Sequence, residues 1–287
     1  MIQAQLRIPG IFGINIFARR NRAIPTTWSE ITDSAQKLLF IRALSLLPFE
    51  QAIIEIARRI LKLNKWQLRR TKTEDLTFLI EQLQWMHLQA SANAIISQFT
   101  HDNIIYALPK DDFIGCTAFE FATADDYFKE WTDEPKDMKP LLKMVATLCR
   151  PIDKENLLNN GEAREVIQFK NAEFQIEKRA KKFETLDFSV IIIVLKYFEG
   201  VKKKVYEFGI QVGLFEIPLD EEESEFQKKN KSNNAVFGWW TVFRNIMKSQ
   251  NRKEEEIWEM SLWRVLSIMI EEKQQSDELQ KRMDSRN

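Results

Sequence analysis

The chain has 287 residues, of which 44% are hydrophobic and 29% are charged, so it is long enough for one large core or two smaller ones and is not a wholly disordered polypeptide. Lys plus Arg and Asp plus Glu both total 42, and the formal net charge is therefore zero. This balance excludes the overall positive field that is typical of nucleic-acid-binding proteins. Glycine occurs only 8 times, which favours helices over folds built on many tight turns or Gly-rich phosphate-binding loops.

The N-terminal segment, residues 1–24, carries four arginines and no acidic residue. We expect a strand or an irregular arm here, and a solvated arm is favoured over one that binds a polyanion. Its last three arginines follow its apolar residues, which is the wrong order for a secretory signal peptide. The longest apolar run of the chain, Val190–Leu195, is far shorter than the roughly 20 residues that a membrane-spanning helix needs. We therefore expect a soluble, intracellular protein with no membrane partner.

Residues 25–158 are predicted to form a helical domain with short strands. A helix over 33–47 is apolar on most of its circumference and is expected to be buried, whereas a helix over 49–63 is cleanly amphipathic. Thr71 and Glu74 fit a capping box, which predicts a third helix that reaches about Ala94.

The second half of this domain changes in periodicity. Short strands, arranged as a hairpin, are predicted near residues 103–121. Thr123 and Asp126 repeat the capping-box pattern, which predicts a short helix through Trp131. Apolar residues over 141–148 predict another helix, and the proline that follows ends it.

Three further segments complete the predicted organisation. Residues 160–218 are a helical extension, residues 219–234 are a charged linker with almost no apolar side chain, and residues 235–287 are a Trp-rich C-terminal helical segment. In the extension, one apolar stripe has the spacing of an amphipathic helix; it consists of Phe169, Ala172, Ile176, Ala180 and Phe183.

Histidine and cysteine are too few for most catalytic or metal-binding arrangements. His87 lies on an apolar helical stripe without a second His at i+3 or i+4, so we expect a buried structural role. His101 and Asp102 form an HD dipeptide, but the chain lacks the other histidines that a metal-dependent phosphohydrolase would need. Cys116 and Cys149 have no CxxC spacing and no neighbouring histidine, and we expect free thiols. The sequence therefore predicts no catalytic residue, no metal and no cofactor.

Clusters of charge are interpreted as structural or solvated features. The carboxylate pair Asp111–Asp112 does not converge on a metal if it lies on a strand, and Asp125–Asp126 is expected in a first helical turn, where acidic groups favour the helix dipole. Basic clusters with aromatic neighbours allow a nucleic-acid interpretation, but solvated helix faces are favoured because acidic residues are interleaved with them; these clusters are Arg58–Arg59, Arg69–Arg70, Lys178–Lys182 and Lys202–Lys204.

The Trp-rich C-terminal segment is the most informative feature of the sequence. Tryptophan anchors protein interfaces, and it also fills cores. A segment of about 50 residues is barely large enough to bury four tryptophans alone, so it packs either on its own chain or on a partner. The partner-binding interpretation selects Trp239, Trp240, Trp258, Leu262, Trp263 and Leu266.

Four stretches resemble uncharacterised proteins from the tail or structural gene clusters of phages and prophages of the Bacteroidetes. They are IPTTWSEIT (Ile24–Thr32), LLKMVATLCRP (Leu141–Pro151), FGWWTVFRNIM (Phe237–Met247) and EIWEMSLWRVL (Glu256–Leu266). Proteins of this size in such clusters look like tail-assembly chaperones or tail-completion factors. The resemblance therefore implies a virion-structural or tail-assembly role, in the host cytoplasm or in the virion, but it supplies no functional residue.

Together these features predict a mainly α-helical protein with a small β-hairpin insertion. The functional hypothesis is a non-enzymatic chaperone or adaptor for phage tail assembly, which binds protein partners or a second copy of itself. One alternative is a small helical enzyme that uses carboxylate or lysine chemistry. A further alternative is a nucleic-acid-binding module.

Overall fold

The computed structural model describes residues 2–8, 18–71, 73–87, 89–153, 164–165, 167, 169–215 and 239–285. Its described part is mainly α-helical with small antiparallel sheets, which confirms the predicted fold class. The chain divides into two compact units. The first unit contains residues 1–90 and 187–196, and the second contains residues 91–186 and 197–287. The predicted linker over 219–234 lies outside the described residues.

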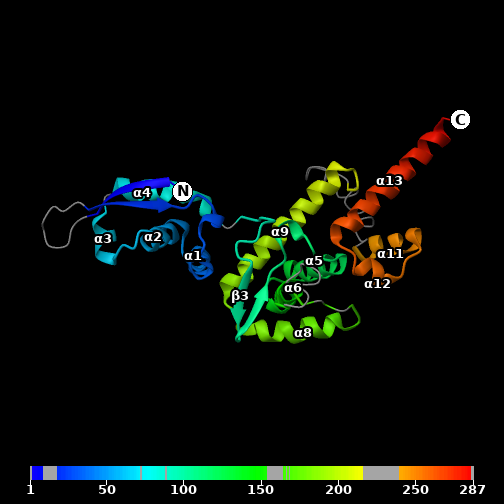
Figure 1. The fold of residues 1–287 in the computed structure, drawn as a ribbon, viewed down its shortest axis with the longest axis horizontal. Helices are drawn as coiled ribbons and strands as arrows, with labels where there is room; N and C mark the ends of the chain where they lie inside the picture. The colour runs from blue at the N-terminus through cyan, green and yellow to red at the C-terminus, as the bar shows by residue number, and fades with distance from the viewer. Residues whose placement is uncertain are drawn as a thin grey trace. The chain divides into compact units, whose positions relative to one another are not determined.

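The first unit pairs a two-stranded sheet with a group of helices (Figure 1). The N-terminal segment, expected as a strand or an arm, forms an antiparallel hairpin in which Ile2 is opposite Ile24. Helices α1 and α2 pack together. The elements are β1 (Ile2–Ile8), β2 (Ala18–Ile24), α1 (Ser34–Leu46), α2 (Phe49–Ile60), α3 (Lys65–Arg70) and α4 (Thr73–Gln82).

Helix α2 forms where its apolar spacing predicts. It buries Ala52, Ile53, Ile56 and Ala57 on one face, and these side chains join a core that includes residues of α1 and α4. On the opposite face Glu55 accepts hydrogen bonds from Arg58 and Arg59. An i, i+4 ion pair between Glu55 and Arg59 is thus present on the outer face of α2, at 2.9 Å.

Two predictions for this unit are wrong. Helix α1 was expected to be buried, but only Phe40 and Ile41 are, and its outer leucines are exposed because the helix is apolar on more sides than its neighbours cover. The third predicted helix ends at Gln82 rather than near Ala94. The chain turns there because Trp85 packs edge-on against Trp28 and donates its indole N–H to the Pro25 carbonyl.

The second unit combines a small three-stranded antiparallel sheet with a larger group of helices (Figure 1). Helix α5 packs on α6, and α6 packs on α8. The C-terminal part of α13 extends beyond the other helices of the unit, and its last residues are exposed. The elements are β3 (Gln98–His101), β4 (Ile104–Ala107), α5 (Ala118–Asp133), α6 (Met138–Leu148), β5 (Arg150–Pro151), α8 (Ala172–Lys182), α11 (Trp239–Gln250), α12 (Glu254–Trp258) and α13 (Leu262–Asp284).

The predicted hairpin is confirmed only in its first part. Strands β3 and β4 are joined by Asp102 and Asn103, both with positive φ angles, as a two-residue hairpin turn requires. Residues 111–121, also predicted as strand, instead form a 3-10 turn and the start of α5. The reason is a capping box six residues before the predicted one. The side chains of Thr117 and Glu120 each accept a hydrogen bond from the backbone N–H of the other residue.

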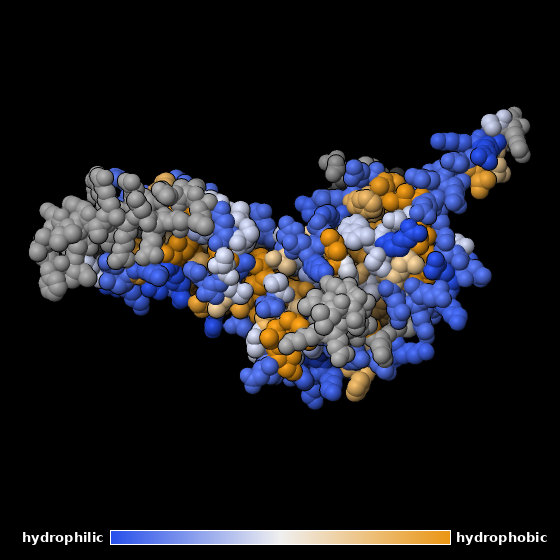
Figure 2. Space-filling model, viewed as in Figure 1, coloured by the Kyte–Doolittle hydropathy of each residue, from blue (hydrophilic) through white to orange (hydrophobic). Residues whose placement is uncertain are grey.

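Helix α9 (Phe188–Gln211) carries residues that belong to both units. Its apolar run over Val190–Leu195 is helical and largely buried. At Gly200 a Cβ atom would lie 2.1 Å from the Ser91 backbone, so only glycine allows this approach. On the face drawn in Figure 2, hydrophobic residues form separate patches within a mostly hydrophilic surface. Within the described residues, no helix has the length and apolarity to cross a membrane.

Candidate functional site

Helix α8 is the element around which the cavities of the second unit gather. Ala172, Ile176, Ala180 and Phe183 of the predicted apolar stripe are buried, which fixes the helix against α6. This anchoring leaves Phe174 facing outwards, with 70% of its surface exposed. An exposed aromatic ring on a rigid helix is a common feature of protein-binding surfaces.

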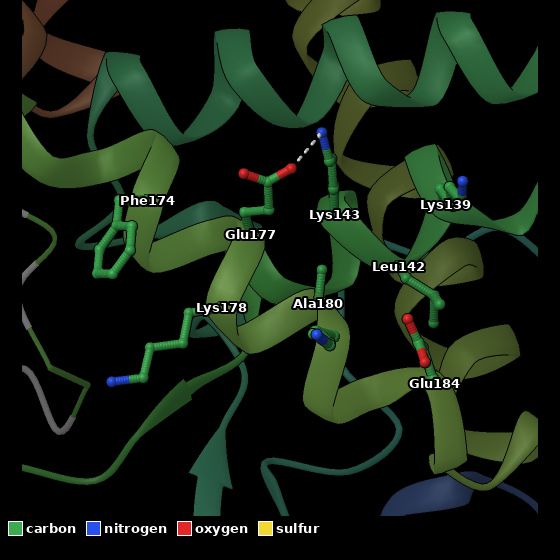
Figure 3. A pocket seen from close by; sticks show the side chains of 9 residues that line it. Lys139, Leu142, Lys143, Phe174, Glu177, Lys178, Ala180 and Glu184 are labelled. Carbon is green, nitrogen blue, oxygen red and sulfur yellow. Dashed lines mark ion pairs between the residues drawn. The ribbon is translucent and has the colours of Figure 1, made fainter.

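A cavity of about 390 Å³ lies on one side of Phe174, and we name it the α6–α8 cavity. Its floor includes Leu142 and Ala180, and its walls carry four lysines and two glutamates. Figure 3 shows Phe174 and Lys178 on one side of the Lys143–Glu177 ion pair, and Lys139, Leu142 and Glu184 on the other. The cavity therefore combines an apolar floor with a mainly basic rim.

A second cavity, of about 530 Å³, lies on the other side of Phe174 and is named the α8–β4 cavity. The cavity lies along one face of α8, because residues three or four positions apart are neighbours on a helix. That face contains positions 174, 175, 178, 179 and 182. It brings Lys178, Arg179 and Lys182 to the cavity, and Glu165 is the only acidic group among the described residues that line the cavity. Lys178 and Lys182 form no ion pair with any described residue, and Gln175 Oε1 is buried without a described hydrogen-bond partner.

Arg179 connects this cavity to the interior of the unit. Its side chain is buried and donates to the Ala146 carbonyl, and its Nη2 lies 3.4 Å from Glu165 Oε2. Burial lowers the pKa of Arg179, although the charge of Glu165 opposes that effect. An arginine held in this way supplies fixed positive charge to the cavity floor.

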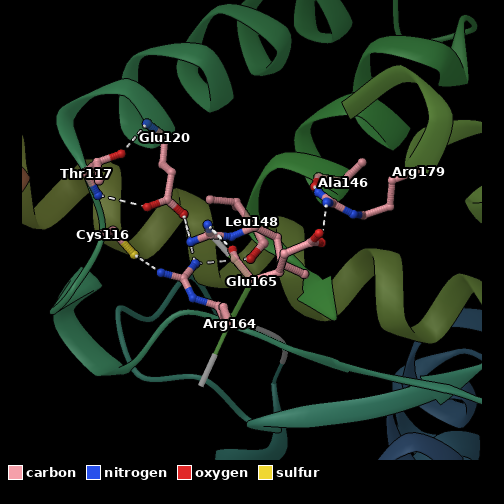
Figure 4. A network of polar contacts seen from close by, with 9 residues as sticks. Cys116, Thr117, Glu120, Ala146, Leu148, Arg164, Glu165 and Arg179 are labelled. Atoms are coloured by element: carbon pink, nitrogen blue, oxygen red, sulfur yellow. Dashed lines mark hydrogen bonds and ion pairs between the residues drawn. The ribbon is translucent and has the colours of Figure 1, made fainter. Parts of the chain in front are cut away.

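Behind Arg179 is a fully buried network of charged groups (Figure 4). Glu120 Oε1 lies 2.6 Å from Arg150 Nη2 and 3.0 Å from Arg164 Nη1. Arg164 also donates to the Leu148 carbonyl and to Cys116 Sγ. Burial by itself raises the pKa of the Glu120 carboxyl, but the two arginines and the hydrogen bonds with Thr117 hold it below its usual value. The network ties α5, the end of α6 and β5 to residue 164.

The two cysteines are free thiols, and both are buried. Burial raises the pKa of the Cys149 thiol to about 12 and raises that of Cys116 further. A nucleophilic cysteine needs a lowered pKa and access to substrate. The environment of both thiols is therefore that of structural residues.

The histidines and the acidic pairs have local structural partners. His87 was expected to be buried, but it is exposed and stacks on Phe49 with ring centroids 3.9 Å apart, because α4 ends before it. His101 Nε2 hydrogen-bonds the Lys182 carbonyl. Within the described part of the chain, no three His, Cys, Asp or Glu residues are grouped as a metal site would require.

The carboxylates at 125 and 126 lie in the middle of α5, not in its first turn as predicted, because the helix begins at Ala118. Asp125 is buried and pairs with Lys129 and Lys202, while Asp126 accepts a hydrogen bond from the Trp240 indole. Asp112 pairs with Lys204. The Lys202–Lys204 cluster is thus committed to ion pairs within the second unit.

The structure separates the six residues selected for partner binding. Trp239, Trp258, Leu262 and Leu266 are buried against their own unit, and their side chains are not available to a partner in this conformation. Trp263 is half-buried, contacts Phe208 and donates its indole N–H to the Asp112 carbonyl. Trp240 is the most accessible of the four tryptophans, with 36% of its surface exposed. Direct contact with a partner stays a prediction for Trp240 and Trp263.

Sequence reasoning missed both Phe174 and the buried charge network. An aromatic residue on the polar face of an amphipathic helix was the available signal for Phe174, which lies two positions from Ala172 and Ile176 of the apolar stripe. The T-x-x-E pattern at Thr117 and Glu120 was the signal for the cap, but nothing local indicates that Glu120 meets Arg164.

Comparisons of the chain with protein-family models, with curated proteins and with solved structures found no match. The cavities and exposed side chains of the second unit are therefore the features that bear on its function.

Proposed function

We propose that this chain is a non-enzymatic assembly or adaptor protein that binds a protein partner through the outer surface of α8. The observation that carries the proposal is the exposed ring of Phe174 between two cavities. A partner that covers this ring would remove apolar surface from water, and the cavities on either side would receive neighbouring side chains.

The charge around Phe174 specifies the chemistry of the partner. The two cavities are lined by Lys139, Lys143, Lys178, Arg179, Lys181 and Lys182, against Glu165, Glu177 and Glu184. This surface is basic although the chain as a whole has no net charge. An acidic segment with one apolar or aromatic anchor is the partner that complements it. The exposed Phe174 ring and the glutamates among the lysines suit a protein segment, which can mix apolar, basic and acidic residues, better than a nucleic acid, whose backbone is uniformly negative.

The resemblance of the four sequence stretches supports the more specific role, in phage tail assembly. In that role the acidic segment belongs to another protein of the tail gene cluster, of which the tape-measure protein is the first to examine. The matched experiment compares Phe174→Ser with Phe188→Ser, because Phe188 is also an exposed phenylalanine, at 48%, but lies outside the α8 surface.

Each protein encoded beside this one would be purified and its binding to the full chain measured by calorimetry. We expect one of them to bind, Phe174→Ser to weaken that binding by about tenfold or more, and Phe188→Ser to leave it unchanged. Equal binding by both variants would show that α8 is not the interface. Binding to single-stranded DNA, with no binding to any tail protein, would favour the nucleic-acid alternative instead.

A further inference from the structure

A third cavity of the second unit, of about 270 Å³, has aromatic walls, and we name it the aromatic cavity. Phe119 and Tyr127 of α5 and Trp240 of α11 line it, and Glu173 of α8 lies at its edge. The rings of Phe119 and Trp240 are 6.4 Å apart and nearly perpendicular. Ligand cavities run from roughly 300 Å³ upwards, so this one suits a single side chain.

Negative charge surrounds these rings. Glu173 is exposed at the edge, and Asp126 accepts a hydrogen bond from the Trp240 indole. Burial, followed by the charges of Glu173 and Glu130, raises the pKa of the Tyr127 hydroxyl. Aromatic faces and carboxylates together attract cations and disfavour anions.

One wall of the cavity already contacts a cation from within the chain. Lys143 Nζ lies 5.5 Å from the centroid of the Tyr127 ring, which is within cation–π range. Lys143 does not line the aromatic cavity; it lines the α6–α8 cavity, where it pairs with Glu177. The Tyr127 ring is therefore positioned to contact a cation, while no lysine or arginine occurs among the described residues that line the aromatic cavity.

We infer that the aromatic cavity binds the ammonium group of a lysine side chain presented by a partner protein. The rings of Phe119, Tyr127 and Trp240 would enclose the ammonium and its methylene chain, and Glu173 would supply the counter-charge. This inference rests on the proposed function in that it assumes a protein partner, but none of the described basic residues that line the other two cavities lines the aromatic cavity.

The test uses the full chain and the probe Nα-acetyl-lysine N-methylamide, whose side-chain ammonium is free. Its neutral match is Nα-acetyl-norleucine N-methylamide. The indole N–H resonance of Trp240, assigned by its loss in Trp240→Phe, reports binding by NMR. We expect this resonance to shift with the lysine probe and not with the norleucine probe. Equal shifts with both would show an apolar cavity, and no shift with either would show that the cavity takes neither side chain; both results overturn the inference.

Variants separate binding from folding. Glu173→Gln, at an exposed position, should weaken lysine binding by about threefold, and Tyr127→Leu by about fivefold, with circular dichroism unchanged. Glu134→Gln is the matched control, because Glu134 is exposed and lines none of the three cavities. An effect of Glu134→Gln as large as that of Glu173→Gln would contradict a specific site. Because the probe is a small molecule, failure here leaves the Phe174 experiment on the proposed function unaffected.

Discussion

Arg164 Nη1 lies 3.0 Å from Glu120 Oε1, although the two residues are 44 positions apart and both are buried. Glu120 also forms an ion pair with Arg150, so one carboxylate contacts guanidinium groups from two separate segments of the chain. A charge is costly to bury unless it is paired and hydrogen-bonded. The structure of the second unit around α5 and β5 therefore depends on this one glutamate.

Glu120→Gln should lower the free energy of unfolding of the second unit by about 3 kcal/mol, because it removes the buried carboxylate that Arg150 and Arg164 share. The neutral amide keeps the size of the side chain, so the loss measures charge rather than volume. Urea denaturation followed by tryptophan fluorescence would measure it. Glu134→Gln is the control, since Glu134 is exposed at the end of the same helix, and a change in stability below about 0.5 kcal/mol is expected there. Equal effects of the two substitutions would contradict the role of the network.

The cost of Glu120→Gln should also depend on pH. The pKa of Glu120 in the folded protein is below 4.5, its ordinary value, so the carboxylate stabilises the fold fully above pH 4.5 and loses this effect as the pH falls through the folded-state pKa. The wild type should therefore approach the stability of the variant in acid. In the first unit, a hydrogen bond from Arg58 lowers the pKa of Glu55 to about 2, which gives a dependence of the same sign. Denaturation at a series of pH values would check this, and a difference in stability that does not shrink as the pH falls below 4.5 would contradict it.

The two cysteines should be unreactive in the folded protein. Both are buried, and burial raises the pKa of Cys149 to about 12, so the thiolate that reacts with disulfide reagents is scarce at pH 8. Ellman's reagent should label neither thiol in the native chain within minutes and should label both in guanidinium chloride. Rapid labelling of one cysteine in the native chain would show an accessible thiol and would revive the enzyme alternative.

The elements that follow from sequence are those whose signals are local. Helix α2 was predicted because its apolar residues recur every three or four positions, and the i, i+4 pair at Glu55 and Arg59 follows from the same geometry. The end of α4 was missed because the indole of Trp85 bonds the carbonyl of Pro25, 60 positions earlier. No helical periodicity contains that information.

The same distinction applies to the candidate sites. The basic residues of α8 were visible in the sequence, but glutamates between them hid the fact that positions 178, 179 and 182 share a face without them. Trp240 was selected for its residue type, and the structure adds the cavity that it lines. The Glu120–Arg164 contact was not predictable, because charge pairs between distant segments leave no spacing pattern in a single sequence.

The C-terminal segment was expected either to bind a partner or to pack on its own chain. A substitution of Trp258 distinguishes these two outcomes. Its ring lies 4.6 Å from that of Phe243, and only 1% of its surface is exposed. Backbone hydrogen bonds from Ala118 to Met260 and from Leu262 to Cys116 join this segment to the start of α5.

Trp258→Ala should therefore destabilise the second unit by about 3–5 kcal/mol, as expected for the loss of a buried aromatic side chain. Trp66→Ala is the control, because Trp66 is 39% exposed and belongs to the first unit, so a much smaller loss is expected there. A chain that ends before Trp239 should aggregate or melt well below the full-length protein, since the apolar surface of α5 would lose its cover. If Trp258→Ala kept wild-type stability but no longer bound the partner, Trp258 would be a binding residue. The packing of Trp258 in this structure would then not be required for the folding of the second unit.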